Sequence, residues 1–309
     1  MLHLSALYRY PLKSCMAEPL QQAGFDELGM SGDRRWMLVD EASGRFYTQR
    51  ALPQMTQLSV LWKGDAVTLS APGLGSLDVQ VPADEEANLR GITIWRDSFR
   101  VPDAGEEAAR WVSALAGKPT RLVHVPQARA RWLPSGYGTV EDRVGFADGF
   151  PLLLIGQSSL DDLSQKVGRP LEMLRFRPNL VVSGAEAFAE DGWKRIRIGD
   201  VELRVLKPCS RCIMTTIDPV TGERSADREP MTTLKTYREK EGEIWFGQNL
   251  VSDGPGQVEV GMPVEVLEQR EPDTSVMKHS WPTPVMRNLL RPTVGAGLLA
   301  NAVNQAPLR

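Results

Sequence analysis

Short runs of alternating apolar and polar residues, separated by turn residues, constrain the fold of this chain more than any other sequence feature. The segment LSVLWKGDAVTLSAPGLGSLDVQVP holds three of them, and its turns fall at residues 63–65 and 73–76. A period of two is typical of strands that bury one face, and Gly and Asp between two runs favour a hairpin. The segment therefore predicts an antiparallel meander.

Other segments of the first 120 residues follow the same pattern. The N-terminal MLHLSALYRYPLKS alternates and is expected to form a strand, and RRWMLVDEASGRFYTQR predicts a hairpin around residues 41–45. One helix is expected in DAGEEAARWVSALAGKP, because apolar residues recur there at helical spacing and Gly117 and Pro119 stand where they would end it. The first unit is expected to close near Lys118.

The second half is also rich in predicted strands. FPLLLIG is a continuous apolar run, and in the following QSSLDDLSQKVG both Ser158 and Ser159 lie three residues before an Asp, which predicts a strand and then a helix with a capping box. WKRIRIGDVELRVLKP predicts two strands joined at residues 199–200, and EIWFGQNLVSD and GQVEVGMPVEVLEQ predict more. The predicted fold class is mainly β, of the α+β type, with few helices.

Length and composition divide the chain into three parts. At 309 residues it exceeds the roughly 250 to 300 residues at which a single core stops growing, so we expect two domains, at residues 1–120 and 121–269. Residues 270–309 carry five prolines and two acidic residues and are interpreted as a proline-rich tail, with a partner-binding segment as the alternative.

Charge and cysteine content exclude several classes of function. The 36 Lys and Arg residues against 39 Asp and Glu give a net charge of −3, so the chain has no basic field to attract nucleic acid or an anionic membrane surface. No apolar run approaches the roughly 20 residues of a membrane helix, and the N-terminus lacks a signal-peptide pattern. Three cysteines in a long chain indicate a reducing compartment, and we expect a cytoplasmic protein.

A C-x-x-C motif in VLKPCSRCIMTTIDP is the main candidate for chemistry. A structural zinc site needs four ligands, which Cys15 and three scattered histidines do not supply, and an iron–sulfur cluster needs four thiolates. A thioredoxin-type pair needs a helix after the first cysteine, whereas the residues after Cys212 are β-branched. A structural pair and a single thiolate held for a soft metal both remain open, and Arg211, between Cys209 and Cys212, favours a thiolate nearby.

The motif and its surroundings resemble a known family. KPCSRCIMTTIDPVTGE, followed by EPMTTLKTYR and FGQNL, is similar to the signature of MOSC proteins, in the branch that includes the mitochondrial amidoxime-reducing components and their bacterial relatives. YPLKSC, GDRRWMLVD and FRPNLVVSG match the same branch in order, so the resemblance covers most of residues 1–268 and leaves out the tail. It implies a β-barrel-like MOSC domain with few peripheral helices, preceded by an N-terminal β-rich domain.

The resemblance also implies a cofactor, molybdopterin carrying molybdenum. Cys212, the second cysteine of the motif, would be the thiolate ligand of the metal and the catalytic residue. The phosphate and pterin of the cofactor would be held by seven matched positions, Lys13, Ser14, Arg34, Arg177, Ser210, Arg211 and Asn249. Arg35 is a rival to Arg34, and Asn179 is a weaker candidate two residues after Arg177.

Other residues of these motifs have ordinary explanations. Asp218, in TTIDP, is interpreted as a turn residue ahead of Pro219, in preference to a carboxylate that orients Arg211. Cys15 is expected to be a small buried side chain, and the histidines lie in no matched motif.

The activity implied by the resemblance is reduction of N-hydroxylated compounds, such as hydroxylamines, amidoximes and N-hydroxylated bases, by oxygen-atom transfer at the molybdenum. Some bacterial relatives carry a C-terminal ferredoxin-like domain with its own cysteines, whereas no cysteine follows Cys212 here. A separate flavin or iron–sulfur reductase is therefore expected to supply electrons. Two alternatives stay open: a carrier of sulfur or of molybdenum cofactor that uses Cys212, and a structural β-protein.

Overall fold

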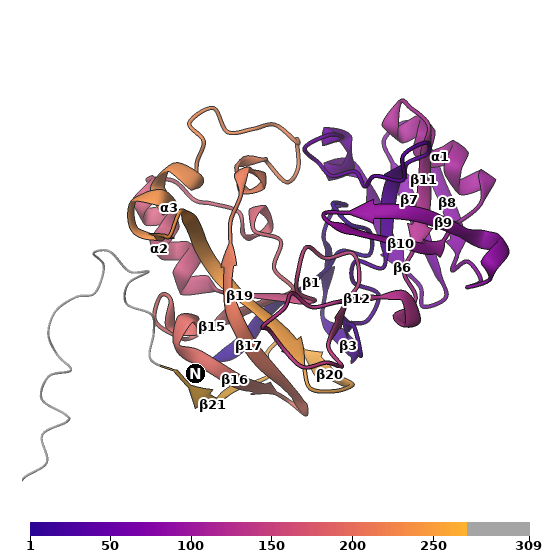
Figure 1. Ribbon diagram of the computed structural model, residues 1–309. Coiled ribbons are helices and arrows are strands. Elements are labelled where there is room, and N and C mark those ends of the chain that lie inside the picture. Colours follow the sequence, from indigo (N-terminus) through magenta and orange to yellow (C-terminus); the bar gives the residue numbers. More distant parts are fainter. Residues whose placement is uncertain (271–309) are drawn as a thin grey trace, which may run out of the picture. The chain divides into compact units, whose positions relative to one another are not determined.

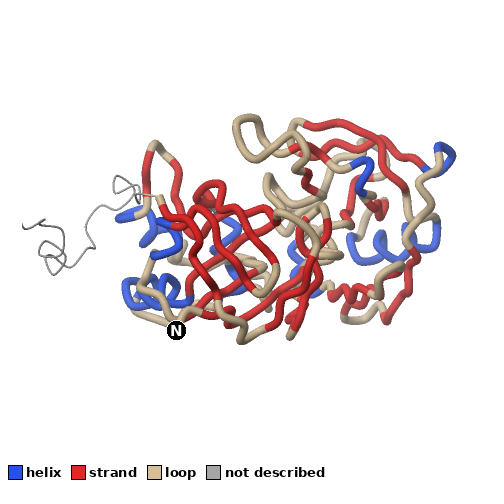
Figure 2. The backbone as a smooth tube through the Cα atoms, turned by 90° about the horizontal axis from the view of Figure 1, so that it is seen from below, coloured by secondary structure: helices blue, strands red, loops and turns tan. Residues whose placement is uncertain are grey.

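The computed structural model describes residues 1–270 (Figure 1). These residues form a mainly β fold with three α-helices, as the colouring by secondary structure in Figure 2 shows. The predicted fold class is confirmed. No helix among residues 1–270 has the length and hydrophobicity to cross a membrane.

The largest sheet has nine strands and joins the two ends of the described chain. Its strands lie in the order β2 (Glu18–Leu20), β1 (His3–Arg9), β15 (Leu180–Ser183), β14 (Leu152–Gly156), β19 (Glu243–Ser252), β17 (Val201–Ser210), β16 (Trp193–Ile198) and β21 (Val264–Gln269), and β18 (Glu239–Lys240) pairs with β19. Only β14 and β15 pair in parallel within this sheet. The predicted N-terminal strand and the strand pair joined at residues 199–200 are confirmed.

Five smaller sheets contain the other strands of residues 1–270. They are β3 (Gln22–Asp26) with β4 (Gly29–Met30) and β20 (Gly256–Glu259); β6 (Ser59–Trp62) with β7 (Ala66–Ala71) and β8 (Gly75–Gln80); β5 (Trp36–Asp40) with β11 (Thr120–His124); β9 (Leu89–Ile94) with β10 (Asp97–Pro102); and β12 (Arg131–Trp132) with β13 (Arg143–Val144). The predicted meander is confirmed as β6, β7 and β8.

The hairpin expected around residues 41–45 is wrong in its second strand. β5 pairs antiparallel with β11, far away in the sequence, and Phe46 makes only a single bridge to Val39. Four consecutive residues of β5 and four of β11 are buried. Pairing of β5 with β11 therefore removes more apolar surface from water than pairing of β5 with the segment that contains the polar residues 48–50 would.

Three α-helices and six short 3-10 helices complete the described chain. They are α1 (Glu106–Ala116), α2 (Gln157–Val167) and α3 (Met231–Tyr237), with η1 (Pro53–Gln57), η2 (Glu86–Asn88), η3 (Gln127–Arg129), η4 (Met173–Arg175), η5 (Ala189–Gly192) and η6 (Ile213–Thr216). The α1 prediction is confirmed: Ala108, Val112 and Ala116 are buried, and Gly117 ends the helix with a left-handed φ of 68°.

The strand followed by a helix after residue 150 is confirmed, but the capping box expected for α2 is wrong. The helix begins at Gln157, so Ser158 and Ser159 lie inside its first turn. Their hydroxyls donate instead to the carbonyl of Ala185 and the carboxylate of Glu190, at 2.7 Å each. These bonds tie α2 to the loop after β15.

The continuous apolar run of β14 is explained by burial on both faces of the sheet. Leu152 and Leu154 belong to one core cluster, with residues of β1 and β16, whereas Leu153 and Ile155 belong to another, with residues of α2 and α3. Successive residues of a strand point to opposite faces, so both faces need apolar side chains.

Strands β1 to β4, from the first 30 residues, pair with each other or with strands that follow residue 150. The division into domains at residue 120 stays a prediction. The predicted proline-rich tail lies outside the described residues, apart from Arg270.

Candidate functional site

A cavity of about 290 Å³ brings together all eight of the sequence-predicted site residues. They are Lys13, Ser14, Arg34, Arg177, Ser210, Arg211, Cys212 and Asn249. These residues come from five stretches, two in the first half of the chain and three in the second, that are far apart in the sequence. Residues that bind one ligand must line one cavity, as these eight residues do. The role of each residue stays a prediction.

The large sheet supplies one wall of the cavity. Asn249 of β19 lies opposite Leu153 of β14 on one side and Lys207 of β17 on the other, and all three line the cavity. Paired residues of neighbouring strands point to the same face, so this row presents its side chains together. β17 ends at Ser210, which places Cys209 inside the strand and Cys212 beyond it.

The two cysteines of the motif have different surroundings. Cys209 is half-buried, and Nη1 of Arg211 donates to its sulfur at 3.0 Å. Cys212 is exposed at the start of η6, where its carbonyl accepts a hydrogen bond from the backbone N–H of Thr215. Cys209 is therefore engaged by Arg211, whereas Cys212 is the more accessible of the two residues.

Tyr10 holds two of the predicted arginines in place. The guanidinium carbons of Arg34 and Arg177 lie 4.4 and 4.1 Å from the centre of its buried ring. Arg34 also donates to Asp33 and, at 2.9 Å, to Oδ1 of Asn179. Burial opposes the charge on Arg34, but the Asp33 carboxylate outweighs it and raises the pKa of Arg34. The Tyr10 ring thus fixes both cations at the cavity.

Several guanidinium groups at the cavity have a buried N–H without a hydrogen-bond partner. The atoms are Nη1 of Arg175, Nη2 of Arg177 and Nε of Arg211. A buried donor left without a partner costs about 1 to 3 kcal/mol. Burial lowers the pKa of Arg177, yet an arginine stays charged in a protein. These three arginines line the cavity and leave part of their capacity to donate hydrogen bonds unused.

Lys13 and Asp148 form an ion pair in the cavity. Nζ of Lys13 donates to the carbonyl of Phe146 at 2.8 Å and to Oδ1 of Asp148. Lys13 is buried, which lowers its pKa, whereas the side chain of Asp148 is 75% exposed. Against desolvation, the Lys13 ammonium lowers the pKa of Asp148 to about 2. Asp148 is therefore ionised at neutral pH.

Backbone strain is concentrated at the same place. Among the described residues, seven other than glycine have a positive φ, and four of these line the cavity. The four are Ser14 (69°), Arg34 (47°), Trp95 (55°) and Arg177 (55°). A left-handed conformation of a residue with a side chain costs about 1 to 3 kcal/mol and is found most often at ligand sites. Three of the four are sequence-predicted site residues.

The rivals weighed from the sequence are separated by the structure. Arg35 pairs with Asp26 at 2.6 Å and does not line the cavity, whereas Arg34 does. Asn179 also lines it, and its buried amide accepts from Arg34 and donates to the carbonyl of Tyr8 at 3.2 Å.

The ordinary interpretations of Asp218 and Cys15 are confirmed. Oδ1 of Asp218 accepts from the backbone N–H groups of Val220 and Thr221, at 2.9 Å each, which is a turn. Oδ2 of Asp218 meets Arg175, at 3.1 Å. Cys15 is fully buried, and burial raises the pKa of its thiol to about 11.

Sequence reasoning missed several residues that line the cavity. They include Arg50, Trp95, Asp148, Arg175 and Lys207. Arg175 directly precedes the matched motif FRPNLVVSG, two residues before Arg177, so its position beside the motif was a usable signal. Nothing in the sequence pattern distinguished Trp95 or Arg50 from surface residues of a hairpin and a loop.

Comparisons with known proteins identify relatives over most of the chain. The family model described as MOSC N-terminal beta barrel domain matches residues 1–119, and the MOSC domain model matches residues 141–265. Mitochondrial amidoxime-reducing component 1 of Homo sapiens is 35% identical over 283 residues, which cover 86% of this chain and 83% of the relative. Mitochondrial amidoxime reducing component 2 of Bos taurus is 33% identical over 282 residues, with the same shares covered.

Proposed function

Because this chain belongs to the MOSC family and has amidoxime-reducing components as relatives, we propose that it is a reductase of N-hydroxylated compounds that uses a molybdenum cofactor. The observation that carries the proposal is a cavity with an excess of positive charge and an accessible thiol, built from motifs far apart in the sequence.

The residues at the cavity fit a cofactor that combines a phosphate, a pterin and a thiophilic metal. Among the described lining residues, seven are Lys or Arg and one, Asp148, is acidic. The buried N–H groups of Arg177 and Arg211 without partners match the need of a phosphate or pterin for donors. The thiolate of Cys212 is the soft ligand that molybdenum would take. Lys13, Ser14, Arg34, Arg177, Ser210, Arg211 and Asn249 would hold the organic part of the cofactor.

When bound, the cofactor supplies two-electron oxygen-atom transfer, so that the N–O bond of the substrate is broken and an amine and water are formed. The protein residues bind and orient. Asp148 keeps the ammonium of Lys13 in place, and because its pKa is about 2 it is ionised at neutral pH. It therefore accepts hydrogen bonds there and does not act as a proton donor.

The remaining parts of the proposal concern partners and location. Substrates are small N-hydroxylated molecules such as hydroxylamines, amidoximes and N-hydroxylated bases. We propose that a separate flavin or iron–sulfur reductase supplies the electrons and that the protein acts in the cytoplasm.

The test is turnover of benzamidoxime and 6-hydroxylaminopurine by protein purified from a host that makes molybdenum cofactor, with a chemically reduced dye as electron donor. We expect the corresponding amidine and amine as products, in proportion to the dye oxidised. Protein that carries molybdenum and pterin but turns over neither compound would contradict the reductase.

The exposure of Cys212 favours one second candidate, a carrier of sulfur or of molybdenum cofactor. A carrier predicts cofactor that is lost on desalting, or a persulfide on Cys212 detected by mass spectrometry, and no turnover under chemical reduction. A reductase predicts cofactor that stays bound through repeated turnover.

A further inference from the structure

Trp95 lines the cavity although none of the matched motifs contains it. It lies in the two-residue turn between β9 and β10, where Ile94 and Asp97 are paired. Such turns favour Asn, Asp or Gly, because their residues adopt positive φ. Trp95 adopts a φ of 55°, which is a rare conformation for a bulky side chain. A tryptophan in this position therefore calls for an explanation beyond the hairpin.

The ring of Trp95 is in contact with neighbouring side chains and is still partly exposed. Phe46 meets it edge to face, with ring centres 5.0 Å apart. Nζ of Lys13 and the guanidinium carbon of Arg50 lie 5.9 and 5.8 Å from its centre. The residue is nevertheless 43% exposed, although it lines the cavity. A held but exposed indole ring is a stacking surface.

Trp95 also borders a second hollow beside the cavity. A groove of about 810 Å³ shares Trp95, Asp148 and Gly149 with the cavity. A substrate could therefore place its N–O group in the cavity while its remaining part lies against the Trp95 ring. The neighbouring groove leaves room for that part of the molecule. The neighbouring Lys13 and Arg50 disfavour a cationic ring at this surface, so a neutral conjugated ring suits it best.

We propose that Trp95 is a specificity-determining residue, whose exposed ring stacks on the planar conjugated part of the substrate. The inference rests on the proposed function and narrows its substrate class. The site would prefer aromatic amidoximes and N-hydroxylated bases to aliphatic N-hydroxylated compounds of equal reactivity.

A pair of substrates with the same reacting group tests the preference. Benzamidoxime carries a planar ring where acetamidoxime carries a methyl group. We expect Trp95→Asn to lower kcat/KM for benzamidoxime by about fivefold, which corresponds to about 1 kcal/mol of stacking, and mainly through KM. The effect on acetamidoxime should be clearly smaller, and Trp95→Phe should retain most of the preference. Asn is the chosen replacement because it accepts the left-handed conformation.

Trp132→Ala is the matched control. Trp132 is an exposed tryptophan of the groove that does not line the cavity, so its removal should leave the ratio of the two kcat/KM values unchanged. Equal losses on both substrates in Trp95→Asn, a loss confined to kcat, or no loss would overturn the proposal.

Binding of adenine separates this inference from the proposed function. Adenine is planar, neutral and not N-hydroxylated, so its affinity for the cofactor-loaded protein, measured by calorimetry, needs no turnover. We expect about fivefold weaker binding to Trp95→Asn than to the wild type. If the wild type turns over neither amidoxime, the proposed reductase function is contradicted, but the adenine experiment still tests the stacking surface. Equal binding of adenine by wild type and Trp95→Asn, or no binding by the wild type, would overturn the proposal that Trp95 is a stacking surface.

Discussion

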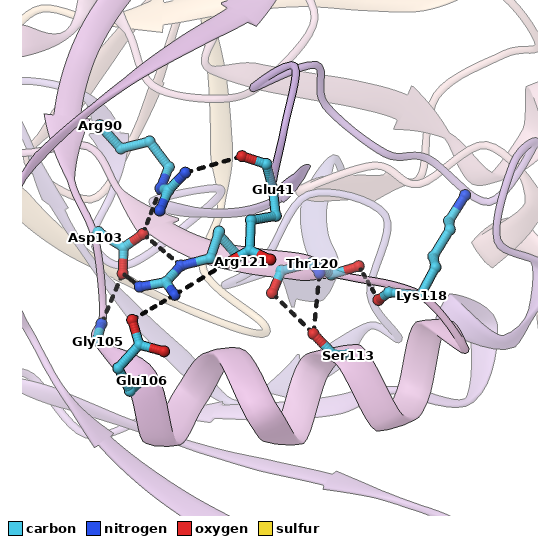
Figure 3. Close-up of polar contacts among 9 residues, drawn as sticks. All are labelled: Glu41, Arg90, Asp103, Gly105, Glu106, Ser113, Lys118, Thr120 and Arg121. Atoms are coloured by element: carbon cyan, nitrogen blue, oxygen red, sulfur yellow. Dashed lines mark hydrogen bonds and ion pairs between the residues drawn. The ribbon is translucent and has the colours of Figure 1, made fainter.

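Two arginine-rich regions of this protein differ in how completely their charges are satisfied. In the cluster around Arg121, drawn in Figure 3, Asp103 accepts from Nε and Nη2 of Arg121 at 2.9 and 2.7 Å and from Nε of Arg90 at 2.7 Å. Glu106 and Glu41 add further contacts to Nη1 of Arg121. Hydrogen bonds from Arg121 and Arg90 outweigh burial and lower the pKa of Asp103.

The cavity shows the opposite arrangement. Arg177 uses Nη1 to donate to the carbonyl of Cys15 at 2.8 Å, but its Nη2 is buried without a partner. Ser14, Arg34 and Arg177 all have strained backbone there, whereas none of the residues drawn in the Arg121 cluster other than Gly105 has a positive φ. The charges of the Arg121 cluster are paired within the protein, whereas Arg177 combines a strained backbone with an N–H donor that has no partner.

The largest expected effect is on stability and comes from the paired cluster. Asp103→Ala leaves the buried Arg121 without its bidentate partner and should lower the free energy of unfolding by about 3 kcal/mol, while molybdenum per folded protein stays unchanged. Urea unfolding followed by circular dichroism measures it. Glu106→Ala is the control, because that carboxylate is exposed and its ion pair contributes less than about 1 kcal/mol. Equal losses of unfolding free energy in Asp103→Ala and Glu106→Ala would contradict the conclusion that the pair of Asp103 with Arg121 stabilises the fold.

The next effect is on the cavity. Arg177→Gln should weaken retention of the cofactor by roughly ten- to a hundredfold, because hydrogen bonds from a charged group to an anion contribute about 1.5 to 3 kcal/mol. The free energy of unfolding of the cofactor-free protein should change by less than about 1 kcal/mol, since a buried donor without a partner is removed together with a bond. Molybdenum content after dialysis and urea unfolding provide the two readouts.

Arg35→Gln is the matched control for Arg177→Gln. Arg35 belongs to a matched motif but pairs with Asp26 and does not line the cavity. Its replacement should leave cofactor retention unchanged. If Arg35→Gln lost cofactor to the same extent as Arg177→Gln, the arginines that line the cavity would not differ in this respect from an arginine that is paired outside it.

The smallest effect concerns the one acid that lines the cavity. The pKa of Asp148 is about 2 in the folded protein, below its ordinary 3.8, so its contribution to stability is present above that ordinary value and is lost as the pH falls towards 2. Because the side chain is mostly exposed, solvent screening limits the contribution to less than about 1 kcal/mol. Wild type should therefore lose slightly more stability than Asp148→Asn between about pH 5.5 and about pH 2.5. Equal losses in urea unfolding would contradict the pairing with Lys13.

Local pattern and family resemblance predicted different parts of this structure. The meander β6 to β8 and helix α1 follow from period and turn residues alone, because their contacts are close in sequence. The pairing of β5 with β11 was missed because it depends on burial between segments about 80 residues apart. A capping box was wrongly expected at Ser158 and Ser159, because tertiary hydrogen bonds outweighed the local signal.

The candidate site shows the same limit. Motif matches identified Arg34 and Arg177, but their stacking on Tyr10 and their positive φ come from the assembled fold. Sequence could not predict that Trp95 of a distant hairpin shares the cavity with Cys212. This depends on the meeting of two segments that no sequence motif connects.

The measurement that tests the central claim most directly is the molybdenum and pterin content of wild type, Cys212→Ser and Cys209→Ser, purified from a host with confirmed cofactor synthesis. We predict near-stoichiometric molybdenum in the wild type and in Cys209→Ser, and loss of the metal or of its activity in Cys212→Ser. Absence of molybdenum and pterin from all three proteins, or a loss confined to Cys209→Ser, would contradict a cofactor held in this cavity by the exposed thiolate of Cys212.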